Sequence, residues 1–253
     1  MEEAVAAGIE QIVLVTARGK TAMVDHFDVD VELETFLEER GKLEQLAAVR
    51  HVSALARPGA VRQGRPLGLG HAVIITRDLV GDQPFAVVLG DDVIDADPPA
   101  IRQLIDVYER MQSPVVAVER VPMESVSRYG VVRAEPLGDG IHRITDLVEK
   151  PSRQDAPSDL AIIGRYVLTP DIFGVLADVR EDRTGEIQLT SGLRALLRRR
   201  PIYACEVRGT RHDTGTKLGF LKASLYFAMQ RPEMRAALTA YAQQLIAERP
   251  GDR

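Results

Sequence analysis

Short apolar runs alternate with helical stretches along the first half of the chain. Apolar, mostly β-branched runs predict strands at Ile12–Thr16, Phe85–Leu89 and Pro114–Glu119, with Val52–Ala56 as a further short candidate strand. Apolar residues at helical spacing predict helices at Val31–Val49 (interrupted by Gly41), Leu69–Leu79 and Ile101–Met111. Strands that are apolar throughout and alternate with helices favour parallel βαβ units in a sheet covered on both faces.

The pattern changes in the second half of the chain. Tyr129–Glu135 and Ile141–Lys150 flank the turn Leu137–Gly140, which predicts a β-hairpin. Further elements are predicted as strands at Ala161–Leu168 and Ile202–Val207, helices at Pro170–Leu176 and Glu186–Arg199, and two closing helices. No repeat, low-complexity tract or linker divides the sequence. We therefore expect one α/β domain over residues 1–253, with a mixed sheet in its second half.

Composition and charge limit the kinds of molecule that we expect this protein to bind. The 253 residues carry a net charge of −5 and no long basic run, so we expect neither nucleic acid nor an anionic membrane as the main partner. No apolar run is long enough to span a bilayer, and the first residues do not resemble a signal peptide. The single cysteine, Cys205, cannot form an internal disulfide, which favours a reducing cytoplasm, and its apolar surroundings predict a core residue rather than a nucleophile.

The first candidate site follows the clearest strand, Phe85–Leu89. Gly90 is followed by two carboxylates, Asp91 and Asp92. Ligands of open α/β sheets collect beyond the carboxyl ends of strands, and carboxylate oxygens suit Mg²⁺. An aspartate at this point is equally typical of a capped turn, so both interpretations stay open.

A glycine-rich stretch, Gln63–Ala72, precedes a predicted helix. Gly64, Gly68 and Gly70 allow the backbone to approach a ligand closely. No Gly-Lys-Ser/Thr follows, so the stretch is not a P-loop, and no strand leads straight into it as in a dinucleotide fingerprint. We interpret His71 as a structural residue.

Glu149 and Lys150 end a predicted strand before Pro151. A carboxylate accepts hydrogen bonds from sugar hydroxyls and an ammonium pairs with phosphate, although two exposed charges side by side are more often a plain surface pair. In the preceding strand, Gly130 leaves room for a sugar against the backbone.

Asp213 lies in Arg211–Gly215, between a predicted strand and a helix. It is a candidate second metal carboxylate, and the alternative is a helix N-cap. The stretch Gly185–Thr190 receives no chemical role.

Taken together, these clusters resemble, in order and spacing, the bacterial UTP–glucose-1-phosphate uridylyltransferases of the sugar-1-phosphate nucleotidyltransferase family. The resemblance runs along almost the whole chain and is carried by Ala6–Thr16, His26-Phe27, Val61–Gln63, Gly68–Ala72, Val148–Pro151, Ala161–Leu168, Gly185–Thr190, His212-Asp213, Gly215 and Lys217–Gly219.

The resemblance implies a Rossmann-like nucleotidyltransferase fold with a mixed, mainly parallel central sheet flanked by helices. It implies UTP and glucose 1-phosphate as substrates, Mg²⁺ as cofactor, and a homodimer or higher homo-oligomer. The implied contacts are Asp91 and Asp213 to Mg²⁺, Gln63 and the backbone near Gly70 to uracil, Gly130, Glu149 and Gly164 to glucose, and Lys150 to its phosphate.

The resemblance has one departure. Members of the family open with a strand and the segment G-x-G-T-R-x-x-P, which binds the UTP phosphates, and this sequence starts after that point. We therefore expect impaired turnover from these 253 residues alone. Three explanations are open: a true start upstream, a truncated and inactive relative, or a first strand supplied by another polypeptide. Two other functions are also open: a non-catalytic nucleotide- or sugar-phosphate-binding relative, and a transferase for another base, such as a thymidylyltransferase.

Overall fold

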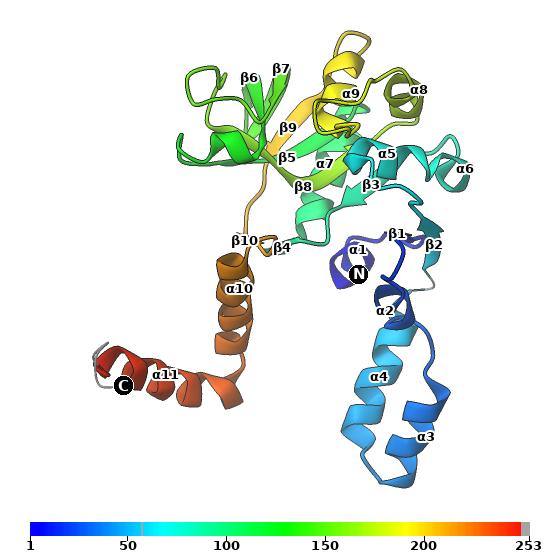
Figure 1. Ribbon diagram of the computed structural model, residues 1–253, viewed down its shortest axis with the longest axis vertical. Helices are drawn as coiled ribbons and strands as arrows, with labels where there is room; N and C mark the ends of the chain where they lie inside the picture. The colour runs from blue at the N-terminus through cyan, green and yellow to red at the C-terminus, as the bar shows by residue number, and fades with distance from the viewer. Residues whose placement is uncertain (57, 249–253) are drawn as a thin grey trace. The chain divides into compact units, whose positions relative to one another are not determined.

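The computed structural model describes residues 1–56 and 58–248, which fall into two compact units (Figure 1). Unit 1 comprises Met1–Val88 and Ala96–Arg208, and unit 2 comprises Leu89–Asp95 and Gly209 onward. That both units form one nucleotidyltransferase domain over residues 1–253 stays a prediction.

A six-stranded sheet is the centre of unit 1, with the strand order β3-β8-β5-β9-β7-β6. Its strands are β3 (Phe85–Val88), β5 (Val115–Arg120), β6 (Gly130–Gly138), β7 (Ile141–Glu149), β8 (Leu160–Leu168) and β9 (Tyr203–Glu206). All nine residues of β8 are buried, as expected for a central strand covered on both faces. The predicted hairpin is confirmed as β6 and β7, and Gly138, Asp139 and Gly140 turn between them with positive φ.

The sheet is mixed, as predicted, although most neighbouring strands within it pair antiparallel. Only β5 and β9 pair in parallel among the described strands of this sheet. Strand β8 inserts between β3 and β5 and runs antiparallel to both. The two strands of the predicted βαβ unit therefore keep a common direction without being neighbours.

Unit 1 also contains helices, some of which pack on this sheet. They are α1 (Glu2–Ala6), α2 (Ala22–Asp25), α3 (Val31–Glu39), α4 (Leu43–Leu55), α5 (Gly68–Ile74), α6 (Arg77–Val80), α7 (Ala100–Met111), α8 (Asp171–Ala177) and α9 (Leu189–Leu196), with a 3₁₀ turn, η1 (Val126–Arg128). Helix α7 packs on β5, β8 and β9, whereas α9 packs on β7 and on α5 and α8. The amphipathic pattern of α7 explains this, because Ile101, Leu104 and Val107 are buried on one side.

Three predicted helix boundaries need correction. The helix expected over Val31–Val49 is two helices separated at Gly41, and the second continues to Leu55, so the candidate strand at Val52–Ala56 is wrong. No helix breaker occurs before Pro58, and the helical hydrogen bonds continue. The helix expected over Leu69–Leu79 divides into α5 and α6.

A separate pair of parallel strands, β1 (Val13–Thr16) and β2 (Gly59–Arg62), also belongs to unit 1. The prediction of a strand at Ile12–Thr16 is confirmed, and Gly8, with φ of +86°, lies just beyond α1 before it.

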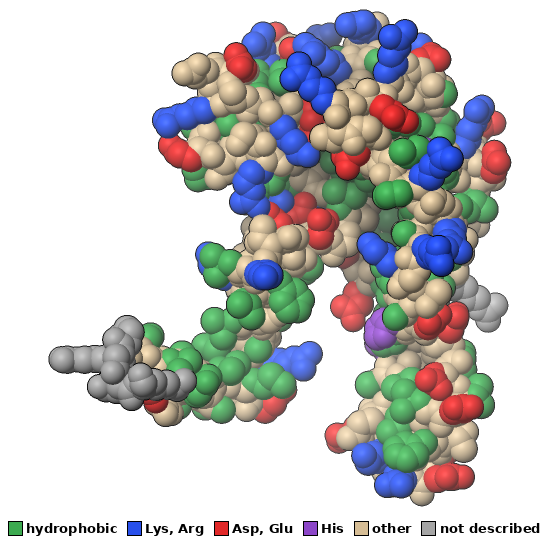
Figure 2. Space-filling model, viewed as in Figure 1, with side chains coloured by type: hydrophobic (Ala, Val, Ile, Leu, Met, Phe, Trp, Pro, Cys, Tyr) green, Lys and Arg blue, Asp and Glu red, His purple; other side chains and the backbone are tan. Residues whose placement is uncertain are grey.

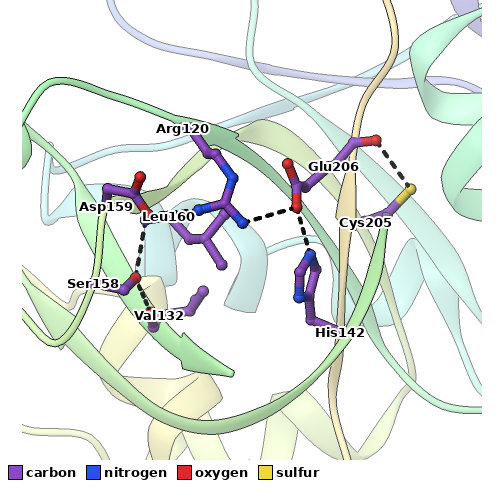
Figure 3. Close-up of polar contacts among 8 residues, drawn as sticks. All are labelled: Arg120, Val132, His142, Ser158, Asp159, Leu160, Cys205 and Glu206. Atoms are coloured by element: carbon purple, nitrogen blue, oxygen red, sulfur yellow. Dashed lines mark hydrogen bonds and ion pairs between the residues drawn. The ribbon is translucent and has the colours of Figure 1, made fainter. Parts of the chain in front are cut away.

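A polar network connects β5, β7 and β9 at one end of the six-stranded sheet (Figure 3). Glu206 Oε1 lies 2.6 Å from His142 Nε2 and 3.3 Å from Arg120 Nη2, and Arg120 also pairs with Asp159 at 2.9 Å. The neighbouring Cys205 is buried, and burial raises the pKa of its thiol to about 11. A thiol of this kind is protonated at neutral pH, which fits the predicted core role.

Unit 2 contains β4 (Asp92–Asp95), β10 (Thr210–Asp213), α10 (Lys217–Gln230) and α11 (Pro232–Ala247). Helix α10 is anchored to β4, because Tyr226 Oη and Gln230 Nε2 each donate to Asp95 Oδ2 at 2.8 Å. These donors, Gln230 first, lower the pKa of Asp95 below its ordinary value. Phe220 and Leu221 of α10 are exposed. Figure 2 shows hydrophobic side chains (green) on the surface of the helices of this unit.

Among the described helices, none combines the length and the hydropathy needed to cross a membrane.

Candidate active site

Two aspartates predicted from distant parts of the sequence meet in unit 2. Strands β4 and β10 pair antiparallel, with Asp213 opposite Asp92. Beyond the pair, the backbone N–H and the hydroxyl of Thr214 both donate to the carbonyl oxygen of Asp91, at 2.7 and 2.8 Å. The turn after β10 is therefore fixed against Asp91, which brings Asp91 next to Asp213.

The carboxylates of these two residues face one point above Gly215. A side-chain carbon at Gly215 would lie 3.2 Å from Asp213 Oδ1 and 3.4 Å from Asp91 Oδ2. Glycine therefore leaves room between two hard oxygen donors. Mg²⁺ is commonly held by one or two carboxylates together with phosphate and water oxygens, so the donor set fits this ion. No group of three or more His, Cys, Asp or Glu side chains that would suit a metal ion occurs in the part of the chain that the structure describes.

The structure distinguishes Asp91 from its neighbour Asp92. Arg211 Nε donates to Asp92 Oδ1 at 2.6 Å, and the side chains are only 11% and 10% exposed. This buried ion pair compensates the charge of Asp92 and connects β4 to β10. Asp91 is therefore the better candidate for a metal ligand.

The alternative interpretation of Asp213 as a helix N-cap is wrong. The N-cap of α10 is Thr216, whose hydroxyl accepts from the N–H of Gly219 at 3.0 Å. Asp213 Oδ1 instead accepts from the N–H of Gly215 at 3.1 Å, which orients the carboxylate toward the turn.

The second group of predicted residues forms a loop in unit 1 that we call the base loop, residues 63–71. Gln63 follows β2, and its N–H donates to the carbonyl of Thr16 at 2.7 Å. Its side-chain Nε2 lies 3.1 Å from the carbonyl oxygen of Gly68 and 3.0 Å from His71 Nδ1. The structure thus joins Gln63 to the glycines that open α5.

Ile187 holds the base loop through its backbone. The N–H of Ile187 donates to the carbonyl of Leu67, and the N–H of Gly70 donates to the carbonyl of Ile187, both at 2.8 Å. A side-chain carbon at Gly70 would lie 2.6 Å from the carbonyl oxygen of Ile187, and one at Gly68 would lie 2.9 Å from Glu186 Cβ. Both glycines are thus required for close contact between two backbone segments.

The stretch that receives no role from the sequence, Gly185–Thr190, therefore supports the base loop. A turn at Asp182 fixes it, because Asp182 Oδ1 accepts from the N–H and hydroxyl of Thr184 and from the N–H of Glu186. These donors, with the Gln188 amide, hold the pKa of Asp182 far below its ordinary value. The turn also explains why the helix expected over Glu186–Arg199 begins only at Leu189.

A third group lies where β6 begins and β7 ends. Gly130 is paired with Glu149, and a side-chain carbon at Gly130 would lie 3.2 Å from Glu149 Oε2 and 2.9 Å from Thr190 Oγ1. Lys150 follows with φ of +43°, and its Nζ lies 3.8 Å from Glu149 Oε1. Lys150 is 56% exposed, so this pair contributes little to stability and its ammonium is accessible to a ligand.

Gly164 lies in β8, where the register with β5 shifts between Val116 and Val118. Its carbonyl oxygen accepts from Arg165 Nη1 at 2.9 Å. Arg165 is 2% exposed and forms a two-pronged ion pair with Glu3 of α1, at 2.9 and 2.7 Å. A β-bulge with a charge-assisted contact holds this part of the strand in one conformation.

The eight predicted site residues thus fall into local groups. Asp91 and Asp213 meet in unit 2. In unit 1, Gln63 joins the loop of Gly70, Gly130 joins Glu149 and Lys150, and Gly164 lies on β8, whose Ile162 contacts Gly130. The backbone contacts of Ile187 and the position of Thr190 were missed, because such contacts leave no signature in side-chain type.

Comparisons with known proteins give the family of the chain. The sequence profile of the family described as Nucleotidyl transferase matches residues 1–230. The UTP–glucose-1-phosphate uridylyltransferase YngB of Bacillus subtilis is 46% identical over 246 residues, which cover 97% of this chain and 83% of that protein. A crystal structure of UDP-glucose pyrophosphorylase complexed with UDP-glucose is 39% identical, with a TM-score of 0.83 over 91% of this chain and 85% of its own. A UTP-bound UGPase from Acinetobacter baumannii is 35% identical, with a TM-score of 0.86 over 98% of this chain and 86% of its own.

Proposed function

Because the chain belongs to the nucleotidyl transferase family, among the UTP–glucose-1-phosphate uridylyltransferases, we infer that it converts UTP and glucose 1-phosphate into UDP-glucose and pyrophosphate. The observation that carries this function is similarity to such enzymes at 46% identity over 97% of the chain. The local groups of the site supply the chemistry that this reaction requires.

The reaction needs alignment and charge neutralisation more than a protein nucleophile. A phosphate oxygen of glucose 1-phosphate attacks the α-phosphorus of UTP, the bond from that phosphorus to the bridging oxygen breaks, and pyrophosphate leaves. The second pKa of a phosphate monoester is about 6, so the attacking group is largely ionised at neutral pH without a base. The barrier arises mainly from bringing two anions together.

Asp91 and Asp213 are the proposed ligands of Mg²⁺, since their oxygens converge above Gly215. When bound, the ion would neutralise charge on the phosphates of the substrates. Lys150 is the proposed partner of the sugar phosphate, and Glu149 Oε2 beside Gly130 is the proposed acceptor of hydrogen bonds from glucose hydroxyls. Gly164 is proposed as a further backbone contact to the glucose.

The base loop is the proposed uracil site. Gln63 presents its amide beside Gly68 and Gly70, whose missing side chains make room for the Ile187 segment that supports the loop. The N–H of Gly70 is already bonded to Ile187, so Gln63 and the remaining backbone groups of the loop would read the base.

A cytoplasmic location and a homodimeric or larger assembly complete the proposal. The first rests on the single buried Cys205 and the second on the family resemblance. Light scattering of the purified protein tests the assembly.

The direct test is pyrophosphate release from UTP, glucose 1-phosphate and Mg²⁺, with dTTP and CTP in parallel. We expect release with UTP and little with the other nucleotides. Binding of UTP without turnover would support a non-catalytic relative, and a preference for dTTP would support a thymidylyltransferase.

A further inference from the structure

The side-chain amide of Gln63 has a defined orientation. The carbonyl oxygen of Gly68 is only an acceptor, so the group facing it at 3.1 Å must be the amide nitrogen, Nε2. The second N–H of Nε2 is directed at His71 Nδ1, at 3.0 Å. Both donors are therefore satisfied within the protein. The carbonyl oxygen, Oε1, accepts no hydrogen bond from residues 1–56 and 58–248 and remains available as an acceptor.

His71 is defined by the same contact. The roles in this contact depend on the tautomer, and the bond from Nε2 of Gln63 to the Gly68 carbonyl assigns Nδ1 of His71 as the acceptor. A hydrogen-bond donor at the position of Nδ1 would face the amide nitrogen of Gln63, which is itself a donor. That contact would favour the amide rotated so that Oε1 and Nε2 exchange places. The orientation of Gln63 thus depends on an acceptor at residue 71.

The partners of Gln63 are themselves held in place. Gly68 lies between Leu67 and Gly70, whose backbone groups are bonded to Ile187 at 2.8 Å. The N–H of Gln63 is bonded to the end of β1 at 2.7 Å. The amide is therefore oriented by a preformed frame rather than by a mobile surface loop, which is the condition for selective recognition.

We propose that His71 is a positioning residue that sets the base preference of the site. It keeps Gln63 Oε1 as the group presented to the base, so that the site selects a pyrimidine with an N–H at position 3. Uracil has this donor. N3 of cytosine is an acceptor, so two acceptors, N3 and Oε1 of Gln63, would face each other. This inference rests on the proposed function, in which Gln63 contacts uracil, and adds the reason for the preference.

The test compares discrimination between UTP and CTP in variants of His71. His71→Leu removes the acceptor and leaves one of two hydrogen bonds to orient the amide. We expect the UTP/CTP ratio of kcat/KM to fall by about fivefold to tenfold, since one hydrogen bond is lost. KM for glucose 1-phosphate should stay unchanged. His51→Leu, on the exposed surface of α4, is the matched control and should keep the native ratio.

Two further variants protect the test against misfolding. Asparagine places its carbonyl oxygen near the position of Nδ1, whereas glutamine reaches the position of Nε2. His71→Asn should keep most of the discrimination, and His71→Gln should lose it. A native UTP/CTP ratio in well-folded His71→Leu and His71→Gln would overturn the proposal. If the wild-type protein does not turn over UTP, the proposed function fails, but the ratio of UTP and CTP dissociation constants from calorimetry still decides the role of His71.

Discussion

The base loop and the aspartate pair are built on opposite principles. In the base loop, residues 63–71, the backbone groups of Leu67 and Gly70 are bonded to Ile187, and both N–H groups of the Gln63 amide have partners. The aspartate pair, Asp91 and Asp213, instead directs two like charges at one point above Gly215. The loop is held by hydrogen bonds within the protein itself, whereas the pair places two like charges near one point, where a cation would offset their repulsion.

From this difference we expect the base loop to govern selectivity between bases and the aspartate pair to govern the rate of the reaction. A preformed loop loses little binding energy to ordering, so it suits discrimination between bases. A pair of carboxylates that held a cation beside phosphates would stabilise charge in the transition state. Variants of the two regions should therefore affect different kinetic constants.

The largest effect is expected from the aspartate pair. Asp91→Asn and Asp213→Asn keep the shape of the side chains and remove one charge each. Loss of a metal ligand should lower kcat by about 100-fold or more, because several kcal/mol of charge stabilisation depend on it. The measurement is steady-state pyrophosphate release over a titration of Mg²⁺. The concentration of Mg²⁺ at half-maximal rate should rise in both variants.

Asp92→Asn sharpens this test. Asp92 is paired with Arg211 rather than directed at Gly215, so its loss should lower the free energy of unfolding by about 3 kcal/mol without changing the Mg²⁺ dependence. Near-native kcat in Asp91→Asn or Asp213→Asn would refute the metal assignment. A changed Mg²⁺ dependence in Asp92→Asn would show that the two neighbours had been assigned the wrong way round.

A variant of Lys150 tests whether a charged side chain of unit 1 contributes to recognition of a substrate. Its ammonium is exposed and only loosely paired with Glu149, so Lys150→Ala should leave the melting temperature unchanged. Loss of a charge-assisted contact to phosphate should lower kcat/KM for glucose 1-phosphate by roughly 10-fold to 100-fold, with a much smaller change for UTP. Lys222→Ala, on the exposed surface of α10, is the control. Equal losses for both substrates would contradict the proposed role.

Gly70 tests the fit of the base loop. In Gly70→Ala the new methyl group would lie 2.6 Å from the carbonyl oxygen of Ile187, so the two segments must separate. Overpacking of this kind costs about 1–3 kcal/mol, and we expect KM for UTP to rise roughly tenfold while the Mg²⁺ dependence stays native. Gly64→Ala in the same loop is the matched control, since a carbon there meets no atom of the described residues within 4 Å. A native KM for UTP in Gly70→Ala would show that the loop is adaptable.

Much of this architecture was predictable from local patterns. The apolar run that became β3, the fully apolar β8 and the hairpin with Gly138 and Gly140 at its turn each follow from residue type and spacing. The site residues were identified by family resemblance, and the structure brings Asp91 to Asp213 and Gly130 to Glu149.

The rest depended on contacts that no local pattern encodes. Strands β4 and β10 are four residues long and carry charged ends, so neither shows an apolar run, and their pairing makes them strands. The insertion of β8 between β3 and β5 is a property of topology, not of any one segment. Ile187 acts on the base loop through backbone atoms, which every residue type has.

The smallest expected effect concerns Asp182, which supports the base loop from a distance through Ile187. Its carboxylate accepts from Thr184, Glu186 and Gln188, which lowers its pKa from the ordinary value of 3.8. A depressed pKa means that the ionised form stabilises the fold above that ordinary value, and that this contribution is lost as pH falls below it toward the folded pKa.

In Asp182→Asn the charge is absent at every pH. We expect KM for UTP to rise only about twofold to threefold, since one acceptor is retained. Thermal melts from neutral pH down to about 3 should show a weaker acid-induced loss of stability in the variant than in the wild-type protein. Asp139→Asn, at the exposed hairpin turn, should behave like the wild type in both measurements. A normal acid response together with a normal KM for UTP in Asp182→Asn would mean that the base loop keeps its shape without the Asp182 turn, and that its rigidity resides in the Ile187 backbone contacts alone.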